Sequence, residues 1–209
     1  MDGELTMLVV LGGAMMLGWL FWRQFDRDKR LRERIEDAPK ATLSTFPVDR
    51  AARVEGIARA ILPPIAAPLS KRPCVYYKVW LIHHVDGNSD GRGWSETLLE
   101  DHGGVEFELD DGTERALVDP RGAELALDTD WRRETLPGMS LSPEQAAFVT
   151  SHDKTAKLAR KLGKKHLRWK EAIVGVDEPI TILGSATREN GRLKLAGEGL
   201  IISDGRERT

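Results

Sequence analysis

An eighteen-residue apolar stretch near the N-terminus constrains this chain more than any other feature. The stretch from Leu5 to Trp22 reads LTMLVVLGGAMMLGWLFW and contains neither a charged residue nor a proline. As a helix rising about 1.5 Å per residue it would span roughly 27 Å, just enough for the hydrocarbon core of a bilayer. A buried helix of a soluble protein would rarely reach this length without one polar face. The sequence therefore predicts a transmembrane helix over residues 5–22.

The residues on either side of this stretch predict its orientation. Six lysines and arginines follow it between residues 23 and 34, and none precedes it. Under the positive-inside rule, the C-terminal side of the helix then faces the cytoplasm. The residues before the stretch are acidic, whereas a cleaved signal peptide needs basic residues there. We therefore expect a single-pass membrane protein with a cytoplasmic globular domain, anchored at the headgroup level by Trp19, Phe21, Trp22 and Arg23.

The chain divides into four segments. These are an N-terminal tail (1–4), the transmembrane helix (5–22), a charged juxtamembrane segment (23–50) and one β domain (51–209) with a helical insertion at about 143–165. The basic half of the juxtamembrane segment either contacts anionic headgroups or serves only as a topology signal. Ala14 and Gly18 form a small-xxx-small pair through which two anchors could pack as a dimer.

Alternating apolar residues predict that the large domain is mostly β, barrel- or sandwich-like. The strongest strand covers residues 74–85 (CVYYKVWLIHHV), and because it is apolar on both faces we expect a central strand. Asp111-Gly112 and Asn190-Gly191 match tight hairpin turns. Further strands are expected at 54–58, 94–99, 104–109, 114–119, 123–127, 168–174, 180–185, 192–196 and 199–203.

The helical insertion carries the best candidate contact surface. Ser142 provides an N-cap and Pro143 suits the first helical position, so a helix is expected from about residue 143 toward Lys161, either continuous or with a break near Ser151. Basic residues spaced by three to four would gather on one face of its second half. They could contact anionic lipid or an acidic protein partner, or form an ordinary solvated face. These residues are Lys154, Lys157, Lys161, Lys164 and Arg168.

The sequence contains no recognisable catalytic, cofactor or metal site. The HExxH, GxSxG, P-loop and GxGxxG motifs are absent, and the single cysteine, Cys74, excludes an intramolecular disulfide and a cysteine-rich zinc site. The formal net charge of -2 gives no reason to expect a nucleic-acid partner. An enzyme whose site is assembled from several strands is the alternative. Its first candidate residues would be Glu171, Asp119, His83 and His84, although neighbours on one strand such as His83 and His84 point to opposite faces.

Five short stretches, in order, resemble the GIDE or BAM ("beside a membrane") domain family. They are VEG (54–56), PLSKRPCVYY (68–77), FELDDG followed by VDP and GA (107–123), WKE (169–171) and ITILG (180–184). The resemblance implies a domain that lies next to a membrane. Its best-known eukaryotic relatives are mitochondrial E3 ubiquitin ligases, whose activity resides in a C-terminal zinc-binding RING.

One cysteine cannot supply the zinc ligands of a RING, so the resemblance does not extend to ligase chemistry. We interpret the chain as a membrane-anchored interaction or sensor module whose partners are the lipid bilayer and an unidentified protein. E3 ubiquitin ligase activity, suggested by the family, and an unrecognised enzymatic site are the alternatives.

The predicted topology can be tested with single cysteines on a Cys74→Ser background. A cysteine placed in the loop between Gly87 and Gly91 should not react with a membrane-impermeant thiol reagent in intact cells, because the domain is expected in the cytoplasm. It should react once the membrane is permeabilised. Labelling in intact cells would show that the predicted orientation is wrong.

Overall fold

The computed structural model describes residues 29–48, 50–85, 93–153 and 159–204, and within them the chain is mostly β. This confirms the mostly β class that the alternating pattern predicts. The predicted transmembrane helix 5–22 lies outside these residues, as do Ala14, Gly18 and the four anchor residues. No helix in the described part of the chain is both long enough and apolar enough to cross a membrane.

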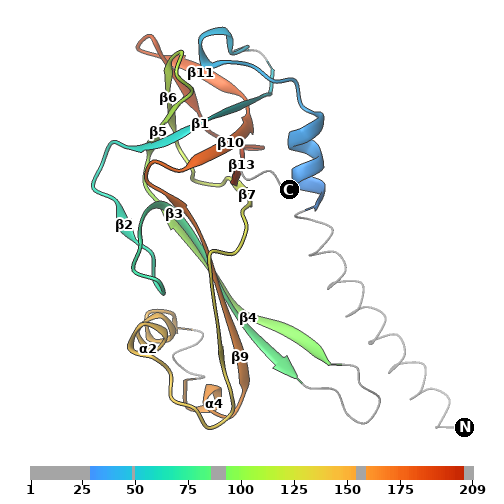
Figure 1. The fold of residues 1–209 in the computed structure, drawn as a ribbon, viewed down its shortest axis with the longest axis vertical. Coiled ribbons are helices and arrows are strands. Elements are labelled where there is room, and N and C mark those ends of the chain that lie inside the picture. Colours follow the sequence, from blue (N-terminus) through green and yellow to red (C-terminus); the bar gives the residue numbers. More distant parts are fainter. Residues whose placement is uncertain (1–28, 49, 86–92, 154–158, 205–209) are drawn as a thin grey trace, which may run out of the picture.

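Eight strands form a curled sheet at one end of the molecule, the upper lobe in Figure 1. Its order is β11-β12-β6-β5-β1-β10-β13-β7, with parallel pairing only for β12 with β6 and β13 with β7 among the described strands. The sheet curls around a core that includes Val54, Phe107 and Ile182, each 0 % exposed. The strands are β1 (Ala52–Ala60), β5 (Phe107–Asp110), β6 (Arg115–Val118), β7 (Glu124–Ala126), β10 (Pro179–Gly184), β11 (Ala186–Glu189), β12 (Arg192–Leu195) and β13 (Ile201–Asp204).

Both predicted hairpin turns are present in this lobe. Asn190 and Gly191, with φ of 51° and 81°, join β11 to β12, where positive φ at both central positions matches the twist of the strands. At the β5–β6 turn, Gly112 has φ of 82°, and the Asp111 carboxylate accepts a hydrogen bond from the Leu43 backbone N–H at 2.6 Å. This bond ties the turn to the 3₁₀ helix η1 (Leu43–Thr45).

A second, longer sheet extends away from the upper lobe (Figure 1). Its order is β2-β3-β9-β8, and β4 pairs with β3 on the side away from β9. β3 therefore lies between two strands along most of its length, which confirms the predicted central strand. The strands of this long sheet are β2 (Ile65–Ala66), β3 (Pro73–Val85), β4 (Trp94–Gly104), β8 (Trp131–Thr135) and β9 (His166–Gly175).

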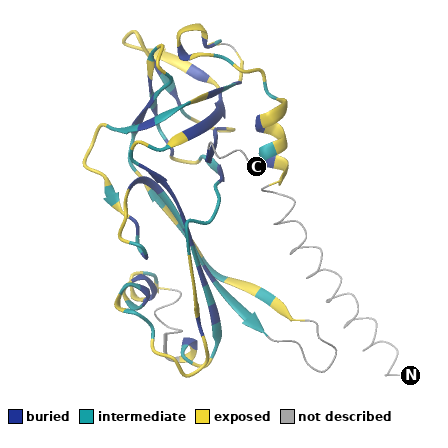
Figure 2. Cartoon of the chain, in the orientation of Figure 1, coloured by how far each residue is buried: buried dark blue, intermediate teal, exposed yellow. Residues whose placement is uncertain are grey.

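Two short helices, α2 (Pro143–Thr150) and α4 (Ala159–Leu162), contribute to a second core on the long sheet. The buried residues of β3, β9 and α2 are dark blue in Figure 2, where these elements alternate between dark blue and other colours. As predicted, Ser142 caps α2, and its hydroxyl and the Gln145 side chain form a reciprocal capping box. The second core contains Leu69, Val79, Leu81, Phe148, Val149, Leu162, Leu167 and Trp169.

The helical segment 29–37 packs against the upper lobe beside β7, β10 and β13. Leu31 and Ile35, one turn apart, are 4 % and 6 % exposed, and they pack against a small cluster of Ala126, Leu183 and Ile201. Arg32 reaches two carboxylates of the domain, Asp128 at 3.0 Å and Asp204 at 3.3 Å. The described end of the juxtamembrane segment is therefore docked on the β domain.

Strand boundaries differ from the prediction where the two sheets meet. A strand was expected over 104–109, but β4 continues to Gly104 and β5 begins at Phe107. The Tyr76 ring lies so close to Gly104 that a Cβ on this glycine would stand 2.4 Å from the tyrosine Cδ2.

The strands β2, β8 and β11 were not predicted. Of these, β8 reads WRRET, whose polar residues hide its period.

Replacing Gly104 with alanine should destabilise the fold. The added methyl group would clash with the Tyr76 ring, which is 3 % exposed and cannot move away without repacking the core. We expect a loss of about 1–3 kcal/mol in the free energy of unfolding, the usual cost of overpacking a core. Denaturant unfolding of the full chain measures it. The control is Gly163→Ala, where nothing lies within 4 Å of the new Cβ; equal stability of both variants would contradict the packing argument.

Candidate functional site on the open face of the long sheet

The two faces of the long sheet differ sharply in burial. On one face, Val79, Leu81, Leu167 and Trp169 are each 0 % exposed in the second core. The alternate residues point to the opposite face, which we call the open face, and most of them are half-buried or exposed. The open face carries Lys78, Trp80, Ile82 and His84 from β3, His166, Arg168 and Lys170 from β9, Arg132 and Glu134 from β8, and Ser95, Thr97, Glu100 and His102 from β4.

Apolar side chains on this face explain why β3 reads as apolar on both sides. Trp80 and Ile82 on this face are half-buried. Lys78 lies with its Nζ 4.9 Å from the centre of the Trp80 ring, and the same ammonium pairs with Glu100 at 2.7 Å. The lysine and the indole therefore form one cation–π unit on the surface.

Farther along the sheet, charged and imidazole groups form a connected cluster. Glu134 accepts a hydrogen bond from Arg168 Nε at 3.0 Å and lies 3.3 Å from His166 Nε2. These hydrogen bonds, with that of Arg168 the larger, lower the pKa of the Glu134 carboxyl. The His166 ring meets the His84 ring edge-on at 5.3 Å, and His84 Nδ1 lies 2.9 Å from the hydroxyl of Ser95. The two imidazole rings are thus held in a cluster to which four strands, β3, β4, β8 and β9, contribute.

The open face has more cations than carboxylates. Four side chains are cationic (Lys78, Arg132, Arg168 and Lys170) and two are anionic (Glu100 and Glu134), which leaves a net charge of +2 without the histidines. A positive face with interleaved aromatic and aliphatic groups suits an acidic ligand that also presents apolar groups.

The basic residues predicted to share one helix face lie on different elements. Lys161 is exposed on α4 and Lys164 is exposed in the turn that follows, whereas Arg168 lies in β9 on the open face. Lys154 and Lys157 lie outside the described residues. Helical spacing was applied beyond the end of the helix, which is why Lys170, two residues from Arg168 on the same strand face, was missed.

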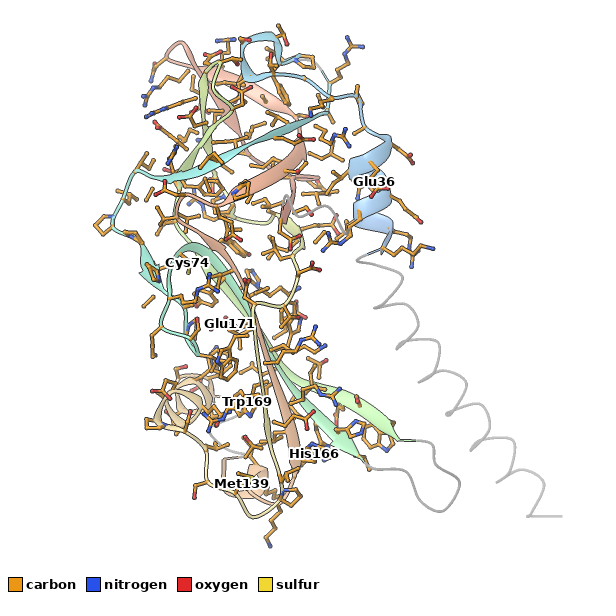
Figure 3. All side chains as sticks on the ribbon, viewed as in Figure 1. Glu36, Cys74, Met139, His166, Trp169 and Glu171 are labelled. Carbon is orange, nitrogen blue, oxygen red and sulfur yellow. The ribbon has the colours of Figure 1, made fainter. Side chains whose placement is uncertain are left out.

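The candidate catalytic residues do not converge in the structure. Figure 3 labels Glu171 near the middle of the long sheet and His166 near its far end. Asp119 pairs with Arg121 at 2.5 Å in the upper lobe. His83 contacts Lys165 at 3.3 Å on the face opposite His84. A surface hollow of about 350 Å³ is lined instead by Glu55, Gly56, Ile57, Arg59, Asp110, Asp111 and Gly112.

Glu171 has a structural role that its sequence context did not reveal. Its side chain is 0 % exposed, and its carboxylate accepts hydrogen bonds from the backbone N–H groups of Leu69 at 2.7 Å and Ser70 at 3.1 Å. These bonds attach the irregular segment before β3 to the middle of β9. Because buried backbone N–H groups need acceptors, the carboxylate is committed to holding this segment.

Cys74 is buried, at 0 % exposed, close to Ile173 and Ala67. Burial first, and then the charge of Glu171, raise the pKa of the thiol to about 12. The thiolate that would act as a nucleophile is therefore not formed near neutral pH. Among the described residues, no three histidine, cysteine or acidic side chains are placed to hold a metal ion together.

A family model for the GIDE domain, described as E3 ubiquitin ligase, matches residues 81–199, more than half of the chain. The chain belongs to the GIDE family. The matched region includes most of the open face, both short helices and the strands of the upper lobe from β5 to β12. No curated protein and no solved structure matches the chain. This family assignment confirms the resemblance drawn from the five short stretches.

Removing the Glu171 carboxylate should unfold the junction between the segment 67–72 and β9. Glu171→Ala leaves two backbone N–H groups buried without an acceptor, which should lower the free energy of unfolding by about 3 kcal/mol. Glu171→Gln keeps one oxygen acceptor and should lower the free energy of unfolding by less. Thermal and denaturant unfolding measure both effects. The control is Glu96→Ala on the exposed part of β4, and a Glu171→Ala variant as stable as that control would rule out the structural role.

Proposed function

We propose that this GIDE-family chain is a membrane-tethered binding module, and that the open face of the long sheet recognises an acidic segment of a partner protein. The observation that carries the proposal is the contrast between the two faces of one sheet. One face is sealed by a core, whereas the other presents Trp80, Ile82 and a net positive charge without a covering layer among the described elements. Such uncovered aromatic and aliphatic groups are typical of contact surfaces.

The geometry of the face favours an extended polypeptide ligand. Its cations follow two neighbouring strands, with Arg168 and Lys170 alternating along β9 and Arg132 directly beside Lys170 on β8. Carboxylates spaced along an extended segment could approach these groups in turn, while apolar side chains of the segment cover Trp80 and Ile82. Complementary charge of this kind gives specificity and speeds association more than it adds raw affinity.

The docked helical segment 29–37 supports the tethering part of the proposal. The segment follows the predicted transmembrane helix in sequence, and Leu31, Ile35 and Arg32 attach it to the upper lobe. A tether that is part of the folded domain holds the open face in a restricted range of orientations relative to the bilayer. It also raises the local concentration of the module for partners at the same membrane.

The ligase activity in the family description does not follow from these 209 residues. A RING binds zinc through several cysteines and histidines, and the sequence contains a single cysteine that is buried beside Ile173. The groups that could serve an unrecognised enzyme are separated, and Glu171 is used for backbone hydrogen bonds. The binding role is therefore the function that the geometry supports best.

Charge reversal on the open face should weaken binding of an acidic probe. The probe is a fluorescent peptide of glutamate residues interrupted by leucines, titrated against the full chain in detergent and followed by anisotropy. Arg132→Glu and Lys170→Glu should each reduce its affinity about five- to tenfold, the size of an interaction near 1 kcal/mol. Added salt should also weaken binding, because it screens exposed charges.

Arg133→Glu is the matched control, since Arg133 is an exposed arginine on the same strand but points to the opposite face. This variant should bind the peptide like the unmodified chain. The absence of binding by the unmodified chain, or an equal loss in the Arg133 variant, would rule out recognition by the open face.

A further inference from the structure

The far end of the long sheet presents two large apolar side chains to solvent. Leu136 is 49 % exposed and Met139 is 53 % exposed, and both lie in the loop 136–141 between β8 and α2. Figure 3 labels Met139 at the end of the molecule opposite the upper lobe. We call this end, defined by Leu136, Met139, Lys161 and Lys164, the distal tip. Neighbouring apolar groups at a protruding end need an explanation, because folding does not bury them.

The loop is held in place from both sides, so this exposure is built into the fold. The Gly138 backbone N–H donates to the Gly163 carbonyl at 2.8 Å, and the Met139 N–H donates to the Leu136 carbonyl at 3.0 Å. Gly138 has φ of 86°, which suits a glycine and turns the chain between the two apolar residues. The capping box of α2 then fixes the C-terminal end of the loop. Leu136 and Met139 are therefore presented by a fixed turn.

Two lysines flank the apolar pair. Leu162 is 0 % exposed and anchors α4 in the second core, which leaves Lys161 exposed on this helix. Lys164 is also exposed and directly follows Gly163, whose carbonyl holds the loop. The acidic groups nearest in sequence to the loop are Glu134, which pairs with Arg168 at 3.0 Å, and Glu144 in the first turn of α2. The pKa of Glu144 is lowered first by hydrogen bonds from its own backbone N–H and from Ser142, and then by the charges of Lys71 and Arg133. The tip thus combines protruding apolar groups with ammonium groups.

We propose that the distal tip contacts an anionic lipid bilayer, with Leu136 and Met139 entering the interface and Lys161 and Lys164 lying among the headgroups. Apolar side chains surrounded by lysines are the usual composition of surfaces that bind in the plane of a membrane interface. Each of these lysines would add an electrostatic attraction to an anionic leaflet, and salt would screen this attraction. This surface is separate from the open face, so the inference does not depend on an acidic protein partner.

A bilayer fits this end better than a protein groove for two reasons. The apolar groups are about half exposed on a turn, and lysines accompany them where a protein-binding centre is commonly rich in arginine and aromatic residues. In Figure 1 the helical segment 29–37 begins at its lower end, on the side toward α2 and α4. The described part of this segment therefore begins on the side toward which the tip points, and the proposal takes the bilayer to lie on that side.

A fluorescent label at the tip tests the contact. Met139→Cys in the full chain is labelled with an environment-sensitive dye, which spares Cys74 because that thiol is 0 % exposed with a pKa raised to about 12. The protein is reconstituted into phosphatidylcholine vesicles with and without phosphatidylserine. With phosphatidylserine, the emission should shift to shorter wavelength and spin-labelled lipids should quench it several-fold. The positional control is Leu62→Cys, which replaces a residue 50 % exposed between β1 and β2.

Charge variants identify the groups responsible. Lys161→Glu combined with Lys164→Glu should abolish most of the quenching at position 139, and high salt should reduce it, whereas Arg132→Glu on the open face should leave it unchanged. Equal, unquenched emission at positions 139 and 62 would overturn the proposal. Quenching that is independent of phosphatidylserine and of both lysines, or that is lost equally in the Arg132 variant, would overturn the assignment to these residues.

Discussion

The pairing of β3 with β9 is the interaction on which the rest of the structure depends. It joins residues about ninety positions apart, in antiparallel register from Cys74 with Gly175 to His84 with His166. Near its start, Val75, Tyr76 and Val174 belong to the core of the upper lobe. Farther along, the same strands supply the second core beneath α2 and α4. One strand pair therefore contributes to the core of the upper lobe and to the second core. It also connects the upper lobe to the distal tip.

The alternation of side chains within this pair separates structural groups from groups available for binding. On the covered face, the Trp169 indole and the Gln145 amide both donate to the Thr135 hydroxyl, at 3.2 Å and 3.5 Å, which joins β9, β8 and α2. Glu171 on the same face holds the Leu69 backbone. Among the described residues, no buried side-chain polar atom of this face lacks a hydrogen-bond partner, as burial requires. On the open face, Lys78 pairs with Glu100 and Arg168 pairs with Glu134, while Arg132 is exposed to solvent.

Structural features that depend on short-range stereochemistry could be predicted from the sequence. Features that depend on which distant strands pair could not. Hairpin turns at Gly112 and Gly191 and the Ser142 cap follow from short-range stereochemistry, so they could be predicted. The composition of the open face could not be predicted, because it depends on which strands become neighbours. Arg132 lies beside Lys170 only through the β8–β9 register. The prediction that basic residues of the helical insertion share one helix face failed for a related reason. Its charge spacing continues across the start of β9, where the chain changes period from 3.6 to 2.

The juxtamembrane segment shows what a charge run does not reveal from sequence alone. Its arginines suggested contact with lipid headgroups, yet Arg32 pairs with Asp128 and Asp204, the latter with only 7 % of its side chain exposed. Those carboxylates lie about one hundred or more positions away and cannot be assigned as partners from a local pattern. Because an arginine shared by two carboxylates and two buried apolar residues hold the segment, turning it relative to the domain would break all these contacts together. A segment attached in this way transmits orientation as well as proximity, since a bilayer that fixes the direction of residue 29 also restricts the directions in which the open face and the distal tip can point.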